Sequence, residues 1–401
     1  MSPEPPGRRP RSVGRRIATL TTAWVVGAAL LRGTLLAPEV CPPFTADDAH
    51  ASAVAAVDWI VDNQFDTGRY LYLYNRTTGE TPPAYNLVRH AGTTMAVYQL
   101  VAAGEPQYLP AADRATRYML DRMVETDPGA AAWAEPGNDL QLGAAALMTL
   151  SLLIRREATG DEAFDDELRA LGRFMEGQQL EDGVMLERWT FAGRGPDPTQ
   201  RSRYATGEAL WAFAYLHDTF PGDGWDDAAW RTLDYLSLRR DDEERLFPNP
   251  WPDQWAAYSL GQMAGWELEP HQLAYARSLA AQFGVQVRWD SQRNGGISTL
   301  AHPPEPRGAG FGTVLEGLGR IGVLAATDPR MQDLQAPLEA RLVCGAARLA
   351  AAQVTAGEVV GDVAEYEIGA WFLNGETRMD DQQHAASGML WAEAVLRREA
   401  P

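Results

Sequence analysis

The 401-residue chain carries 35 Lys and Arg against 54 Asp and Glu, a formal net charge of −19, and 45% of its residues are hydrophobic. This charge balance excludes nucleic-acid binding, because affinity for phosphates comes from clustered cations. The ordinary hydrophobic content indicates a large folded core. The 13 Trp and 13 Tyr residues supply flat, partly polar rings, which pack in cores and also suit sugar rings.

The first 36 residues have the pattern of a membrane anchor. Five arginines between residues 8 and 16 precede an apolar run from Ile17 to Leu31, and further apolar residues follow Arg32 up to Leu36. A basic flank before an apolar stretch is typical of a secretion signal or signal anchor with its basic side in the cytoplasm. No clean small-residue cleavage site precedes Cys41, so we expect a retained anchor rather than a cleaved signal; an amphipathic N-terminal tail is the alternative. The expected regions are a cytoplasmic tail (1–16), a transmembrane segment (17–36), a linker (37–45) and an extracytoplasmic folded domain (46–401).

After the linker, two kinds of helical pattern alternate along the chain. One kind has a one-sided apolar stripe, which is typical of a helix with a solvated back. Its members are 46–63, 108–126, 161–179, 225–239, 270–287 and 331–354. The other kind is apolar all round and rich in small residues, so it must be surrounded by protein. Its members are 86–103, 139–156, 204–217, 253–265, 310–326 and 383–398.

Several of the one-sided helices end in a similar way, which indicates a repeat. Gln64 and Gly68, Gln179 and Gly183, and Gln353 and Gly357 mark these ends, and β-like stretches follow at 70–74, 184–190 and 358–372. Self-similar units of about 50 to 65 residues imply a solenoid or a closed array. Six outer and six inner helices fit a closed double ring better, and no linker divides the array.

On these features the chain resembles the six-hairpin (α/α)6-toroid group of glycoside hydrolases, polysaccharide lyases and sugar epimerases, with terpenoid cyclases as topological cousins. The resemblance covers about residues 46–399 and includes no diagnostic catalytic motif. It implies an all-α (α/α)6 toroid, here with an N-terminal membrane anchor helix. It also implies a binding mouth at the N-terminal ends of the inner helices, and a polysaccharide or oligosaccharide as the partner.

Polar and aromatic side chains gather at the starts of the inner-type helices. We predict that Arg89, His90, Tyr204, Glu208, Asp253 and His384 meet at one mouth of the ring. The predicted catalytic residues are Glu208, Asp253 and His90. The predicted substrate-binding residues are Tyr72, Tyr85, Arg89, Tyr204, Trp251, Trp255 and His384.

Each of these residues also has a structural interpretation. Glu208 lies one turn inside an apolar helix, where its pKa should be raised for work as a general acid, unless it pairs with Arg203 or Arg89. Asp253, after a Pro-rich loop, is expected to be the wetter carboxylate and the base, or else a helix N-cap. Arg89 and His90 could instead pair with a buried carboxylate and a loop carbonyl.

The first hypothesis is a carbohydrate-active enzyme that acts on a cell-envelope or extracellular polysaccharide, with the type of reaction left open. Glycoside hydrolysis needs two carboxylates at a fixed separation, whereas lyase or epimerase chemistry needs a base such as His and a cation. A non-catalytic glycan-binding or assembly protein and a terpenoid cyclase-like enzyme are the alternatives. No metal-ligand spacing and no phosphate loop occurs, so no metal or cofactor is expected. Pairing between Cys41 and Cys344 stays open.

Overall fold

The structure, a computed structural model, describes residues 13–246, 252–293, 296–302, 307–358 and 364–399. The chain forms two compact units. The smaller comprises residues up to Val40 together with 288–304, and the larger comprises 41–287 together with the chain from 305 onward.

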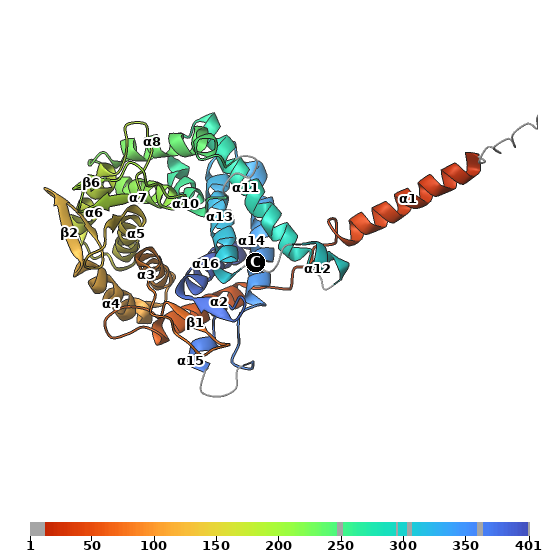
Figure 1. Ribbon diagram of the computed structural model, residues 1–401, viewed down its shortest axis with the longest axis horizontal. Coiled ribbons are helices and arrows are strands. Elements are labelled where there is room, and N and C mark those ends of the chain that lie inside the picture. Colours follow the sequence, from red (N-terminus) through yellow and green to blue (C-terminus); the bar gives the residue numbers. More distant parts are fainter. Residues whose placement is uncertain (1–12, 247–251, 294–295, 303–306, 359–363, 400–401) are drawn as a thin grey trace, which may run out of the picture. The chain divides into compact units, whose positions relative to one another are not determined.

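The larger unit is a closed double ring of helices (Figure 1). Its inner helices are α3 (Leu87–Ala102), α5 (Leu142–Thr159), α7 (Ala205–Thr219), α10 (Gln254–Gln262), α13 (Gly308–Thr327) and α16 (Met379–Glu399). Each inner helix packs against the next, and α16 packs against both α13 and α3, which closes the ring. The outer helices are α2 (Ala46–Asp62), α4 (Leu109–Leu120), α6 (Asp165–Gly177), α8 (Trp225–Leu238), α11 (Pro270–Ser291) and α14 (Gln335–Ala350). The expected six-hairpin toroid is therefore confirmed.

Sequence pattern explains which helices lie inside. In α5 every residue from Leu142 to Arg155 is buried, whereas α6 buries only the stripe of Leu168, Leu171, Gly172, Phe174 and Met175. Small residues let the inner helices approach closely. A Cβ on Gly312 of α13 would lie 2.4 Å from the His384 backbone of α16, so the contact between these helices requires glycine.

Short strands stand before several inner helices. Strand β1 (Leu73–Asn75) pairs with β7 (Glu376–Arg378), and β4 (Leu140–Gln141), β5 (Arg188–Thr190) and β6 (Gly195–Pro196) form a second antiparallel sheet. The expected helix 108–126 is too long. It ends as α4 at Leu120, and a hairpin of β2 (Met123–Asp127) and β3 (Ala130–Trp133) follows, with Gly129 at a positive φ in its turn. Of the expected stretch 358–372, residues 359–363 lie outside the described chain.

The remaining elements are short. They are the single-turn helices α9 (Arg240–Glu243) and α15 (Ala364–Glu367), and the 3-10 turns η1 (Pro106–Tyr108), η2 (Met263–Gly265) and η3 (Gln332–Leu334). A disulfide joins Cys41, ahead of α2, to Cys344 of α14, with 5.0 Å between their Cα atoms. The open question of cysteine pairing is thereby answered.

The smaller unit contains α1 (Val13–Gly33) and α12 (Ile297–Ala301). The large apolar side chains of α1 are exposed, among them Ile17, Leu20 and Trp24. By length and hydropathy, α13 is the one helix in the described part of the chain that could cross a membrane, and 67% of its apolar window is buried, as expected for a core helix. The membrane anchor stays a prediction.

Candidate functional site

The starts of the inner helices surround a central pocket of about 620 Å³. This volume lies within the roughly 300–1,000 Å³ usual for small-ligand sites. The charged and aromatic side chains that line it include Arg89, Glu187, Tyr204, Glu208, Trp255, Arg307, Arg378, Asp380 and His384. Five of the ten residues singled out from the sequence line this pocket: Arg89, Tyr204, Glu208, Trp255 and His384.

Glu208 is a buried carboxyl group in the first turns of α7. Its side chain is 2% exposed, and its Oε2 atom has no hydrogen-bond partner in the described structure. It lies so close to α5 that a Cβ on Gly143 would be 2.5 Å from Oε2. Burial raises the pKa of Glu208 well above its ordinary value, and the neighbouring charges of Glu187 and Asp253 raise it further. Glu208 therefore binds its proton more tightly than an exposed glutamate does.

Glu187 is a second carboxyl group in the same pocket. It lies just before β5 and is held by its backbone, which accepts from the Leu142 amide (2.8 Å) and donates to the Gln200 carbonyl (3.0 Å). Its Oε2 atom is also buried without a partner among the described residues. Burial raises the pKa of Glu187 to about 7, against the lowering effects of Arg188 and a hydrogen bond to Ser202. Sequence reasoning passed over Glu187, although a glutamate between buried Leu186 and Trp189 is a signal that could have found it.

Ion pairs also lie at the central pocket. Arg89 and Arg378 both contact Asp380, at 3.0 and 2.9 Å, and Arg307 contacts Asp381 at 2.7 Å. Arg89 also donates a hydrogen bond to the Tyr72 hydroxyl. Tyr72 therefore positions Arg89 and is not itself among the residues that line the pocket. Each of these cations already has a carboxylate partner.

His384 and Glu316 form a dyad at the pocket edge. Nδ1 of His384 lies 2.8 Å from Oε2 of Glu316, and the Glu316 side chain is fully buried. Burial lowers the pKa of His384, but the charge and hydrogen bond of Glu316 outweigh it, and the net shift is upward. Because Glu316 occupies Nδ1, Nε2 is the ring nitrogen that remains for other partners. The Trp255 ring lies 5.7 Å from the imidazole, centroid to centroid.

Asp253 has a different environment from the one expected. Its side chain is fully buried, and it accepts hydrogen bonds from the amides of Trp255 (3.0 Å) and Ala256 (3.1 Å) and from the guanidinium of Arg240. The expectation of a wetter carboxylate is wrong, because α9 brings the buried Arg240 against it. Asp253 is the N-cap of α10.

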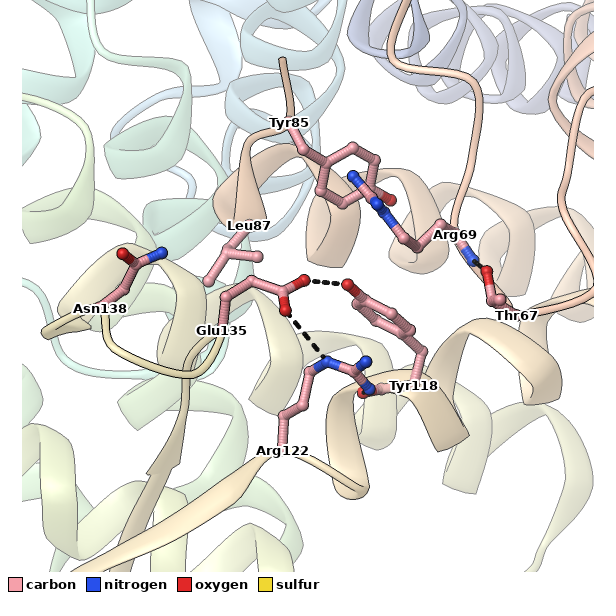
Figure 2. A pocket seen from close by; sticks show the side chains of 8 residues that line it. All are labelled: Thr67, Arg69, Tyr85, Leu87, Tyr118, Arg122, Glu135 and Asn138. Atoms are coloured by element: carbon pink, nitrogen blue, oxygen red, sulfur yellow. Dashed lines mark hydrogen bonds and ion pairs between the residues drawn. The ribbon is translucent and has the colours of Figure 1, made fainter. Parts of the chain in front are cut away.

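A second cavity, of about 420 Å³, lies beside the start of α3. Figure 2 shows its lining, which includes Tyr85. The predicted residue His90 is fully buried next to this cavity and is absent from the lining of the central pocket. Its Nε2 donates to the Ala115 carbonyl (3.1 Å), and its Nδ1 accepts from the Tyr85 hydroxyl (2.6 Å). Burial lowers the pKa of His90 to about 4. His90 thus contacts a backbone carbonyl, as its structural interpretation expected, but that carbonyl belongs to α4 and not to a loop. Trp251 lies outside the described residues.

Comparisons with known proteins find the fold but no sequence family. No protein-family model matches the chain, and no curated protein matches it. Among solved structures, a D-mannose isomerase is 15% identical, with a TM-score of 0.61 over 89% of this chain and 100% of its own. The cellobiose 2-epimerase of Spirochaeta thermophila is 15% identical, with a TM-score of 0.56 over 88% and 99%.

A third solved structure is an inactive variant of an α-1,6-mannanase of glycoside hydrolase family 76, from Salegentibacter sp., in complex with α-1,6-mannotriose. It is 12% identical, with a TM-score of 0.54 over 87% of this chain and 99% of its own. Sequence identities this low show a shared fold and do not show a shared function. The chain thus has the six-hairpin toroid fold that these sugar-acting proteins share.

Proposed function

We propose that this protein is a carbohydrate-active enzyme that hydrolyses glycosidic bonds in a polysaccharide or oligosaccharide. The observation that carries the proposal is the pair of Glu208 and Glu187 in one pocket. Each has a raised pKa and a carboxyl oxygen without a partner among the described residues. Glycoside hydrolysis needs two carboxyl groups with different pKa values, one protonated as the general acid and one ionised as the base or nucleophile.

The roles follow from the difference in burial. Glu208, the more deeply buried group, keeps its proton and donates it to the glycosidic oxygen as the bond to the anomeric carbon breaks. Glu187, ionised through half of its population near neutral pH, takes a proton from the water that adds to that carbon. The net reaction consumes one water molecule and leaves the pair with one proton. Tyr204, which is 48% exposed, offers a flat surface for a sugar ring, whereas Trp255 lines the pocket but is only 3% exposed.

The test is turnover by the full-length protein against a panel of envelope and extracellular polysaccharides. New reducing ends would report hydrolysis, and new double-bond absorbance would report elimination. Glu208→Gln and Glu187→Gln should each lower turnover by at least about 100-fold, while Glu181→Gln, at an exposed turn, should leave it unchanged. Binding of glycans without turnover of any of them would favour the non-catalytic glycan-binding alternative.

A second reaction is supported by the His384–Glu316 dyad. A histidine oriented by a buried carboxylate can move a proton next to a sugar carbonyl, as aldose isomerisation or epimerisation requires. Two of the proteins that share the fold are named for such reactions. Interconversion of free aldoses that His384→Gln abolishes and Glu187→Gln spares would favour this reaction over hydrolysis.

We also infer that the protein is held in a membrane by residues 17–36, with its folded domain outside the cytoplasm. The arginine-rich flank, the exposed apolar surface of α1 and the Cys41–Cys344 disulfide support this location, because disulfides persist in oxidising compartments. The test is a fusion, after residue 401, of a reporter enzyme that works only in the cytoplasm. Activity of this fusion in intact cells would contradict the proposed location.

A further inference from the structure

The second cavity is built differently from the central pocket. Figure 2 shows two tyrosines and two arginines facing each other across it, with Glu135 between them and Asn138 and Thr67 at its margins. The guanidinium of Arg69 lies 4.0 Å from the centre of the Tyr85 ring, and that of Arg122 lies 3.7 Å from the centre of the Tyr118 ring. The cavity thus combines flat surfaces with positive charge.

The two arginines differ in how their charge is satisfied. Arg122 contacts Glu135 at 3.3 Å, and Glu135 also accepts a hydrogen bond from the Tyr118 hydroxyl. Arg69 has no carboxylate within ion-pair distance in the described part of the chain, and its Nε atom is buried there without a hydrogen-bond partner. A cation without a counter-charge is conspicuous in a protein of net charge −19. It favours an anionic ligand group, which a guanidinium binds with two parallel hydrogen bonds.

The fold holds this wall in place. Gly68 adopts φ +90° in the turn before Arg69, and a Cβ there would lie 2.4 Å from the Arg114 carbonyl oxygen. The Tyr85 hydroxyl donates to His90 Nδ1 (2.6 Å) and accepts from the Tyr70 amide (3.1 Å). A neutral, fully buried His90 therefore fixes the ring on which Arg69 lies. A wall fixed by buried hydrogen bonds is pre-organised for binding.

The second cavity also lies close to the central pocket. Leu87 lines the second cavity, whereas Asn86, Val88 and Arg89 line the central pocket. The two cavities therefore lie against neighbouring residues at the start of α3.

We propose that the cavity between Arg69 and Tyr118 is a second glycan subsite that binds an anionic sugar residue of the chain held in the central pocket. The anionic group, a carboxylate, sulfate or phosphate, contacts Arg69, and the sugar ring lies in the cavity beside the guanidinium groups of Arg69 and Arg122, which cover the two tyrosine rings. The idea of a shared glycan chain rests on the proposed function, whereas binding of the anionic sugar does not.

The experiment is calorimetric binding to the full-length protein of three probes: trigalacturonate, a sulfated disaccharide and inorganic phosphate. Neutral α-1,6-mannotriose serves as the comparison. Arg69→Gln should weaken binding of the charged sugar that binds best by about tenfold or more, and binding of mannotriose by less than about twofold. Arg76→Gln is the matched control, because Arg76 also lies over an aromatic ring, that of Phe372, and is not part of either cavity. Arg69→Lys, which keeps the charge, should restore part of the affinity.

The identity of the bound probe distinguishes the carboxylate, sulfate and phosphate sources. Equal affinities of the wild-type protein and Arg69→Gln for every charged probe would overturn the proposal, as would a lack of binding by all three at millimolar concentration. Arg69-dependent binding in a protein that turns over no glycan would support this site and count against the enzyme. Turnover of a glycan without Arg69-dependent binding would support the proposed enzyme and overturn the proposed site in the second cavity.

Discussion

Glu187→Gln and Glu208→Gln should make the protein more stable at pH 8 while abolishing turnover. Both carboxyl groups have folded-state pKa values above the ordinary 4.5. A raised carboxyl pKa means that the native state holds the proton more tightly than the unfolded state does. The stability that this gives is fully present below pH 4.5 and is lost as the pH rises through the folded pKa. Glutamine is neutral at every pH, so a glutamine variant does not lose this stability as the pH rises.

The size of the effect follows from Glu187. Its pKa rises from 4.5 to about 7, and each pH unit in that window costs about 1.4 kcal/mol. The penalty at pH 8 is then about 3–4 kcal/mol, which Glu187→Gln should remove. Burial also raises the pKa of Glu208, and the charges of Glu187 and Asp253 act in the same direction, so Glu208→Gln should also be stabilising at pH 8. In a domain of this size, about 3 kcal/mol corresponds to a rise in Tm of a few degrees.

Urea unfolding at pH 4 and pH 8, with Glu181→Gln as the control, measures the effect. The free energies of unfolding of wild type and variants should converge at pH 4 and diverge at pH 8, and the control should follow wild type at both. A loss of stability in either variant would refute the reasoning, because it would show that the carboxyl group is ionised and held by partners in the fold.

Three further substitutions test neighbouring parts of the structure. Gly143→Ala should displace the Glu208 carboxyl, since the new Cβ would lie 2.5 Å from Oε2, and should lower kcat at least about tenfold with little change in secondary structure by circular dichroism. Asp253→Ala should lower the free energy of unfolding by at least about 1 kcal/mol in urea titrations, because it removes the N-cap of α10 and the carboxylate that pairs with Arg240. Cys41→Ser should lower the free energy of unfolding by about 2–5 kcal/mol, because the disulfide joins residues 303 positions apart. Wild-type protein treated with a reductant should show the same free energy of unfolding as this variant.

Much of the fold could be predicted because it depends on periodicity. A helix that is buried all round and one that is buried on a single stripe have different sequences, and α5 and α6 differ in this way. The end of α4 could not be predicted from the same signal. Met123 and Val124 continue an apolar pattern that a helix or a strand could use. Pairing with Ala132 and Trp133, a tertiary contact, selects the strand.

In the candidate site, too, helix periodicity could place some residues and not others. Arg89, Glu208 and His384 could be placed at the central pocket because the start of each inner helix faces the mouth. His90 is one residue further along than Arg89, and one residue turns a helix by about 100°, so its ring lies against α4 instead. The partner of Asp253 could not be foreseen, since Arg240 reaches it from a single-turn helix. Glu187 lies before a strand, where the helical pattern carries no information.

The charged groups in the two cavities favour different sugars: a neutral sugar in the central pocket and an anionic sugar in the second cavity. In the central pocket, Asp380 and Asp381 already neutralise Arg89, Arg378 and Arg307 in part, and Glu187 and Glu208 line the same pocket. An anionic group there would face carboxyl groups and would compete for cations that have partners, so this pocket suits a neutral sugar. In the second cavity Arg69 has no such competitor among the described residues. If both proposals hold, the substrate is a heteropolymer in which a neutral residue stands at the cleaved bond and an acidic residue lies close by. Weak turnover of neutral mannan and strong turnover of a mixed, uronate-containing glycan would follow, and Arg69→Gln should reduce the difference between them by raising KM for the mixed glycan while leaving kcat unchanged.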